Sequence, residues 1–155
     1  MSRAFVKEAD ETDALTDIGE RPISSYPNDV TPEGLALIEQ ALEEAHRQHA
    51  EAQARNDRAA LARAARDLRY WTARRASAQV IQPPADKSRV HFGSTVTLER
   101  EDGRRQIFRI VGEDEADIAK GKLSHAAPLA RALFGKTVGE TAQAGSSTVE
   151  ILDIA

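Results

Sequence analysis

The sequence has no cysteine among its 155 residues, which excludes disulfide bonds and thiolate metal ligands. It also has no apolar run close to the roughly 20 residues that a membrane-spanning helix needs. The amino terminus lacks the basic-then-apolar order of a secretory signal. These absences predict a cytoplasmic protein that does not enter a membrane.

The chain has little net charge for its size, with a formal value of −4 at pH 7. Such a balance argues against a protein that holds nucleic acid by phosphate neutralisation alone. The acidic excess lies in residues 1–30, which contain seven acidic and three basic residues. This stretch has no hydrophobic period and carries prolines at positions 22 and 27, so we predict an acidic flexible tail.

Residues 31–81 have the pattern of two helices. Thr31 followed by Pro32 is typical of a helix start, because the hydroxyl caps free amides and proline at the first position loses no hydrogen bond. Apolar positions then recur at steps of three and four, as in a coiled coil. The facing pairs of an antiparallel hairpin are 35 with 78, 38 with 75, 42 with 71, 45 with 68, 49 with 64, and 52 with 61. Every pair sums to 113, which predicts a turn between Asn56 and Asp57.

Charge favours the same pairing of the two arms. Residues 32–55 carry five acidic and two basic residues, whereas residues 57–79 carry two acidic and six basic ones. Exposed pairs of this kind contribute only about 0.2–1 kcal/mol each, so they select orientation more than they supply stability. We predict an antiparallel coiled-coil hairpin.

The stretch at residues 82–86 contains two consecutive prolines, which end the second helix and mark a linker. Short strand-like segments follow at residues 89–92, 94–100, 105–111, 123–125, 141–144 and 148–154. Asp102-Gly103 favours a hairpin turn, and Pro128 with Gly135 brackets a short helix. Residues 87–155 are therefore predicted to form an antiparallel β-sheet domain with one short helix, which makes the chain α+β.

Several stretches resemble the Gre transcription factors. They are TPEG at residues 31–34, SAQVI at 77–81, FGSTVTL at 92–98, RIVGEDEAD at 109–117 and PLARAL at 128–133. Their order and their position after a helical hairpin match the family over residues 31–155. The resemblance implies that the last domain is similar to FK506-binding proteins, and that the partner is RNA polymerase.

In that family the hairpin enters the polymerase secondary channel and the sheet domain contacts the channel rim. Members that stimulate transcript cleavage carry a pair of acids at the hairpin tip, which help hold a magnesium ion belonging to the polymerase. Carboxylate oxygens suit such a hard cation. The resemblance implies no cofactor other than this shared magnesium, only indirect contact with nascent RNA and DNA, and a monomeric factor without catalysis of its own.

The tip of this sequence departs from the cleavage factors. The hairpin is shorter, as in the relative Rnk, and the tip reads Arg55, Asn56, Asp57 and Arg58. Asp57 is expected to cap the second helix. A minority alternative makes Asp57, with Glu51 further down the arm, a metal-binding pair. The four tip residues are predicted to contact polymerase, where the two arginines suit acidic groups or phosphates.

A second departure precedes Pro128. Cleavage factors place an acid or amide and then serine there, whereas this chain has Ala126 and Ala127. We still predict that Pro128 and Arg131 contact the polymerase rim. The sequence thus predicts an elongation regulator with weak or no stimulation of cleavage. One alternative is a true cleavage factor that uses Asp57. A more remote alternative is a peptidyl-prolyl isomerase of the FK506-binding type. Such an enzyme needs an apolar, largely aromatic pocket, and this domain has only three phenylalanines, which its own core is expected to use.

Two other clusters of side chains have residue types that can bind metals, but we predict that neither holds a metal ion. His46 and His49 have a ligand-like spacing on one helix but no third ligand in view. The acidic cluster at residues 113–117 lacks the glycine and ligand spacing of a calcium loop, so a solvated turn is expected.

Overall fold

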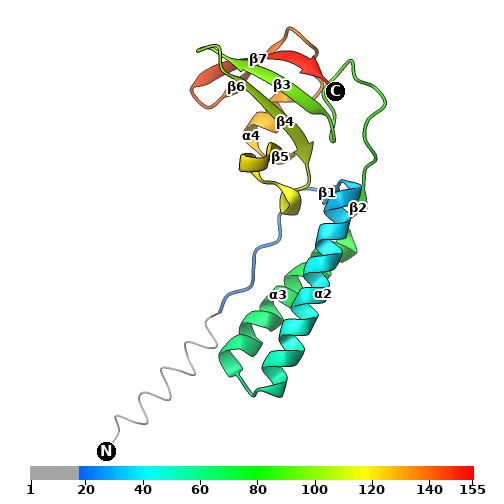
Figure 1. Ribbon diagram of the computed structural model, residues 1–155, viewed down its shortest axis with the longest axis vertical. Coiled ribbons are helices and arrows are strands. Elements are labelled where there is room, and N and C mark those ends of the chain that lie inside the picture. Colours follow the sequence, from blue (N-terminus) through cyan, green and yellow to red (C-terminus); the bar gives the residue numbers. More distant parts are fainter. Residues whose placement is uncertain (1–17) are drawn as a thin grey trace, which may run out of the picture. The chain divides into compact units, whose positions relative to one another are not determined.

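The computed structural model describes residues 18–155, which form two compact units (Figure 1). The hairpin unit comprises residues 38–77 together with the described residues up to Ser25. The sheet unit comprises Tyr26–Leu37 and Ala78–Ala155. No helix within residues 18–155 is both long and apolar enough to cross a membrane.

Two long helices make up the hairpin. Helix α2 spans Pro32–Ala54 and helix α3 spans Arg58–Ser77. They run side by side (Figure 1), and Arg75 of α3 pairs with Glu39 of α2 at 3.0 Å. Their seam buries mostly small side chains, at Ile38, Ala45, Ala52 and Ala64. The predicted α+β order of two helices followed by a sheet is confirmed.

The seam departs from the predicted rhythm in the last turns of α3. The sequence places Arg75 on the inner face, whereas the structure buries Arg74 and leaves Arg75 exposed. Arg75 is long enough to reach Glu39 at the surface while its neighbour turns inward.

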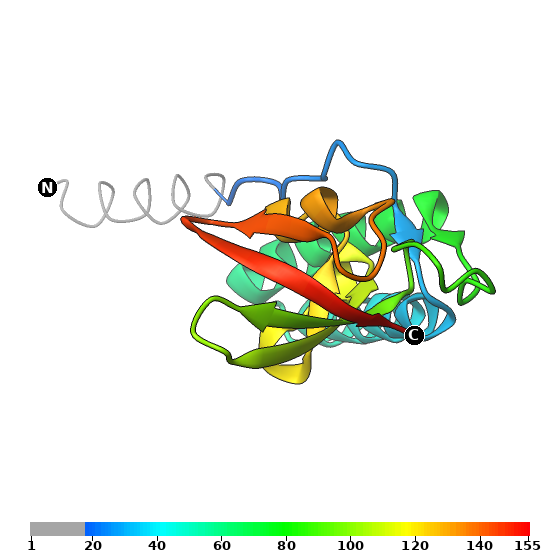
Figure 2. The same cartoon turned by 90° about the horizontal axis from the view of Figure 1, so that it is seen from above.

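Five strands form one sheet in the order β5-β4-β3-β7-β6. Their bounds are β3 Thr95–Arg100, β4 Arg105–Val111, β5 Lys122–Ser124, β6 Thr141–Ala144 and β7 Ser147–Ile154. Figure 2 shows the long β7 between β6 and β3. Short 3₁₀ turns η1 (Glu113–Glu115) and η2 (Ile118–Lys120) separate β4 from β5, and helix α4 covers Pro128–Leu133.

The prediction of a purely antiparallel sheet is wrong at one edge. β4 pairs with β5 in parallel, because the two 3₁₀ turns carry the chain back before β5 begins. The predicted strand at residues 89–92 is absent too. Val90 exchanges backbone bonds with Lys136 and Gly135, each at 2.9 Å, and Gly93 at φ +86° ends the extended run.

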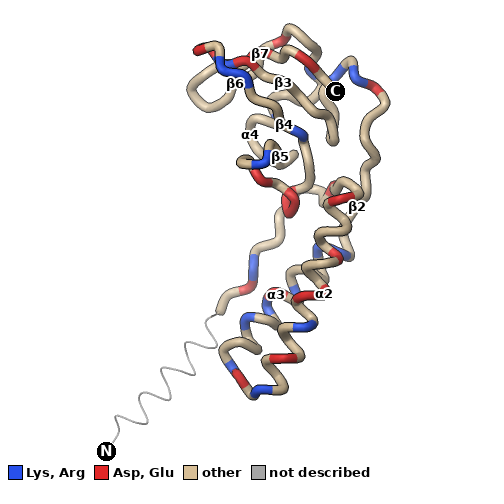
Figure 3. Tube along the Cα trace, in the orientation of Figure 1, with Lys and Arg blue, Asp and Glu red and all other residues tan. Residues whose placement is uncertain are grey.

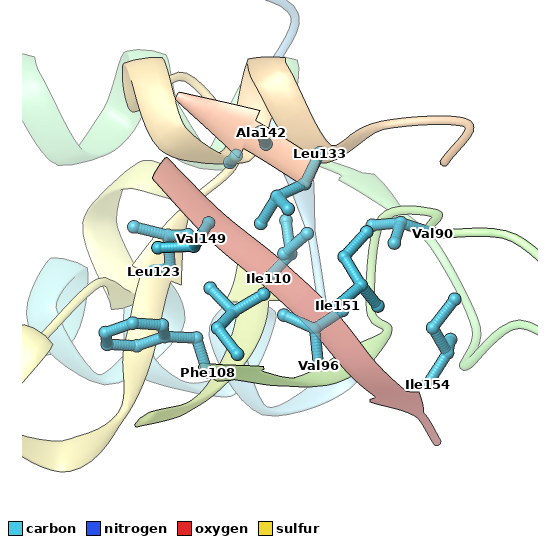
Figure 4. Packing of buried hydrophobic residues seen from close by; sticks show 12 residues of the cluster. Val90, Val96, Phe108, Ile110, Leu123, Leu133, Ala142, Val149, Ile151 and Ile154 are labelled. Carbon is cyan, nitrogen blue, oxygen red and sulfur yellow. The ribbon is translucent and has the colours of Figure 1, made fainter. Parts of the chain in front are cut away.

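The core of the sheet unit lies under β7, where alternating inward residues meet α4 (Figure 4). Val96, Ile110, Leu133, Val149 and Ile151 are fully buried there. Burial of each large aliphatic side chain contributes about 1.5–3 kcal/mol. This core is what holds the loops around α4 in place.

A small parallel pair joins the approach to α2 with the exit from α3. β1 (Asp29–Val30) pairs with β2 (Gln79–Val80), and the Gln79 amide donates to Asn28 O at 2.9 Å. Gly112 fits against this pair because a Cβ there would lie 2.8 Å from Asp29 O. Residues 18–30 therefore differ from the predicted flexible tail, since long-range partners order them. Residues 1–17 lie outside the described part.

The linker carries a strongly bonded carboxylate at Asp86. The hydroxyl and amide of Ser88 donate to it at 2.5 and 2.9 Å, and the His91 ring lies 3.2 Å away. These bonds lower the pKa of Asp86 from 3.8 to about 2. A depressed folded pKa gives stability that is complete above the unfolded value and is lost as pH falls through the folded one.

We expect an NMR titration of the Asp86 carboxyl group to have its midpoint near pH 2. The contribution of these bonds to the free energy of unfolding should be lost as the pH falls from 3.8 to about 2. Ser88→Ala removes the first and largest cause, so its midpoint should move back toward 3.8. A midpoint near 3.8 in the unmodified protein would contradict these contacts.

Candidate functional site

The hairpin tip is a three-residue reversal at residues 55–57. The Arg55 amide donates to Glu51 O at 3.1 Å and closes the end of α2. Asn56 has φ +52°, a left-handed conformation that asparagine tolerates better than most residues. The side chains of residues 55–58 are exposed. The turn therefore falls where the pairing of helix positions predicts it.

Asp57 caps helix α3. Its Oδ1 accepts the Ala60 amide at 3.1 Å, and its carbonyl accepts the Leu61 amide at 2.9 Å. A carboxylate at this position also interacts favourably with the helix dipole. One oxygen of Asp57 is thus committed to the fold. The residue as a whole is exposed.

The other residue of the predicted acidic pair, Glu51, has an ion-pair partner of its own. It pairs with Arg47 on its own helix at 2.6 Å. Residues 18–155 contain no group of three or more His, Cys, Asp or Glu side chains placed to hold a metal ion. Metal binding by Asp57 and Glu51 stays a prediction, and so does the absence of a metal at His46 and His49.

A groove of about 250 Å³ runs beside the tip between the two helices. It is lined by Gln48, Glu51, Arg55, Ala60, Arg63, Ala64, Arg66 and Asp67. Arg66 Nε is buried there without a hydrogen-bond partner, and among described residues Arg55 and Arg63 have no ion-pair partner. The groove therefore presents guanidinium groups whose charge is not fully neutralised.

The second predicted contact surface lies in the sheet unit at the start of α4. Pro128 is exposed at the first helical position, after Ala127, which gives no side-chain cap. The preceding loop is held instead by Ser124, whose hydroxyl accepts the Ala126 amide at 3.1 Å. Arg131 is exposed, with its guanidinium 5.5 Å from the Tyr26 ring centroid. Pro128 and Arg131 thus share one short exposed helix.

The predicted solvated turn at residues 113–117 is wrong for Glu115. This side chain is only 5% exposed, and the Thr31 hydroxyl donates to its carboxylate, 2.7 Å from each oxygen. The same hydroxyl accepts the Gly34 amide at 2.9 Å. Two of the stretches that carry the family resemblance therefore meet in space, 84 positions apart.

Gly34 explains why this contact fits. A Cβ on Gly34 would lie 2.5 Å from a Glu115 oxygen, so a larger residue would force this carboxylate to shift. The sequence analysis did not predict the contact between Thr31 and Glu115, although Gly34 is a sequence signal for it. Glycine is a poor helix former, by up to about 1 kcal/mol relative to alanine, so a glycine in the first turn of a helix suggests a close approach.

A two-helix hairpin followed by an α+β sheet unit defines the class of fold, and comparison with known proteins identifies it. Residues 85–155 match the family model described as "Transcription elongation factor, GreA/GreB, C-term". The sheet domain is thus similar to the C-terminal domain of the Gre family, and the relatives below extend this similarity.

Three curated relatives illustrate the likeness. Transcription elongation factor GreB of Pseudomonas aeruginosa is 57% identical over 53 residues, which is 34% of this chain and 32% of that protein. GreA of Alkalilimnicola ehrlichii is 46% identical over 85 residues, or 50% and 54% of the two chains. GreB of Neisseria meningitidis serogroup B is 39% identical over 95 residues, or 57% and 58%.

The chain thus spans about a third to somewhat over half of the length of these relatives. Among solved structures, the Gfh1 protein of Thermus thermophilus aligns with 84% of this chain and 99% of its own. Its TM-score is 0.41 at 20% identity, a likeness too slight to add to the assignment.

Proposed function

We propose that this protein binds RNA polymerase in the cytoplasm and regulates transcript elongation as a monomer. Its hairpin enters the secondary channel, and Pro128 and Arg131 contact the rim. At the tip, Arg55, Asn56, Asp57 and Arg58 touch the channel interior. The factor lends no catalytic group of its own and gives weak or no stimulation of transcript cleavage.

The composition of the tip carries this proposal. A magnesium ion shared with the polymerase needs carboxylate oxygens. The tip offers the single carboxylate of Asp57, one oxygen of which accepts the Ala60 amide at 3.1 Å. Glu51 is engaged by Arg47 at 2.6 Å, and the arginines on either side of the turn repel a cation. Occupying the channel without delivering a metal ligand is the activity that this surface supports best.

The test is a transcript-cleavage assay on backtracked elongation complexes, run with a parallel measurement of binding to core polymerase. We expect binding with a cleavage rate close to that of polymerase alone. Asp57→Ser keeps a capping oxygen but removes the charge, whereas Asp57→Ala removes both. We expect the serine variant to behave as the unmodified protein does. The alanine variant should lose about 0.5–2 kcal/mol of stability without a specific effect on cleavage.

Strong cleavage that both Asp57 variants abolish would establish the alternative, a cleavage factor with one displaced acid. Failure to bind core polymerase would contradict both the proposed non-cleaving regulator and the alternative cleavage factor.

A further inference from the structure

A segment that precedes the hairpin lies against α3, and we call residues 18–25 the strap. Glu20 forms a two-pronged ion pair with Arg69, at 2.5 and 3.0 Å. Arg21 stacks its guanidinium 3.8 Å from the centroid of the Tyr70 ring and lies 5.3 Å from that of Trp71. The same guanidinium is 3.3 Å from Asp67. Two strap residues thus contact four residues of α3 that lie within five positions of one another.

The helix that the strap contacts is strongly basic. Helix α3 carries six arginines and a single acid, Asp67 (Figure 3). Residues 1–20 carry six acids and two bases. Of these acids, the structure describes Glu20, and it places this carboxylate on Arg69 of the basic helix. Such opposite fields attract each other and compete with any outside anion.

The contacts that hold the strap are of a reversible kind. The side chains of Glu20 and Arg69 are 63% and 56% exposed. Ion pairs this exposed add little stability and weaken with salt. The hydrogen bond from Arg69 lowers the pKa of Glu20 below its ordinary value, so the carboxylate is charged at neutral pH. The cation–π stack of Arg21 adds a local anchor that does not depend on Glu20.

Next to the strap, the groove near the tip offers further cationic contacts. Asp67 lines the groove, and its Oδ1 accepts from Arg21 as well as from Arg66, at 3.3 and 3.4 Å. Arg66 Nε is buried without a partner, and Arg63 has no ion pair among described residues. Guanidinium groups in this setting match phosphate oxygens, which accept two parallel N–H bonds from one fork.

We propose that the strap is a built-in competitor for the basic surface of α3, displaced when the phosphate backbone of a single-stranded nucleic acid binds there. Glu20 occupies Arg69 in the free protein, and an incoming phosphate takes the place of the Glu20 carboxylate. Further phosphates reach the arginines of the groove. The strap thereby weakens binding, most strongly at low salt, where the Glu20–Arg69 ion pair is strongest. This inference does not require the proposed function, because it concerns the free protein and a nucleic acid strand.

The experiment measures binding of a fluorescently labelled single-stranded RNA of mixed sequence by anisotropy, with full-length protein and a series of salt concentrations. Glu20→Gln removes the competing charge but keeps the shape of the side chain. We expect it to bind the RNA about two- to fivefold more tightly at low salt, the range set by the loss of one exposed ion pair. The slope of log affinity against log salt should become steeper, because salt no longer weakens a competing ion pair in the free protein.

Glu43→Gln is the matched control. It makes the same change of net charge on an exposed acid of the hairpin that has no ion-pair partner among described residues. If Glu20→Gln and Glu43→Gln tighten binding equally, net charge alone acts and the strap is not a competitor. If neither they nor the unmodified protein bind the RNA at low salt, the proposal fails outright.

Trp71 gives an independent readout of the strap, since it is the only tryptophan in the chain. RNA should shift its emission in the unmodified protein as Arg21 leaves the neighbouring ring. In Arg21→Ala the emission should start near the shifted value and change little on addition of RNA. Emission that RNA leaves unchanged in the unmodified protein, despite binding, would show that strap and RNA do not exclude each other.

Discussion

Replacing Gly34 by alanine should lower the free energy of unfolding by about 1–3 kcal/mol, although the same change in an unobstructed helix stabilises by about 1 kcal/mol. The reason is the carboxylate of Glu115, which a Cβ at residue 34 would approach to 2.5 Å. Glu115 is 5% exposed and bonded to the Thr31 hydroxyl, so it has little room to move aside. Displacing it breaks a buried hydrogen bond that involves a charge.

The sign of the effect should reverse when the obstruction is removed. In a Glu115→Ala background, Gly34→Ala should raise the free energy of unfolding, by about 1 kcal/mol, since only the helix propensity remains. Glu115→Gln keeps the bulk and should preserve the penalty. Urea denaturation followed by circular dichroism measures all four proteins of this cycle. A Gly34→Ala protein that is more stable than the parent would rule out the close approach.

Local patterns in the sequence were sufficient to predict the hairpin. Helix period, the Thr31 cap and the arithmetic of facing positions place the turn at residues 55–57, where the structure has it. The capping role of Asp57 also follows from local chemistry, because a cap bonds only to the next turn of its own helix. Such features depend on neighbours within a few residues, which any single sequence displays.

Two contacts that sequence reasoning missed join distant positions. Thr31 and Glu115 are 84 residues apart, and Glu20 and Arg69 are 49 apart. Acidic residues are rarely buried without a partner, so a glutamate is predicted to be exposed unless its partner is known. The parallel pairing of β5 was missed for a different reason, because strand direction is set by the intervening turns and not by the strand residues.

A larger functional change is expected from one substitution at the tip. Asn56→Asp places a second carboxylate beside Asp57 and so creates the acidic pair that the cleavage factors of the family carry. Aspartate tolerates the left-handed conformation at φ +52°, so the turn should persist. If the hairpin enters the channel, transcript cleavage should rise by about ten- to a hundredfold, the scale on which single groups around a metal affect activity.

Asn56→Gly is the control for this gain, because glycine keeps the turn and adds no charge. It should leave cleavage at the level of the unmodified protein. Combining Asn56→Asp with Arg55→Ala and Arg58→Ala should raise cleavage further, since the two flanking guanidinium groups oppose a cation at the tip. A protein that binds polymerase but stays inactive with both carboxylates in place would mean that its shorter hairpin does not bring the tip to the metal. Length, and not tip chemistry, would then be what separates this protein from the cleavage factors.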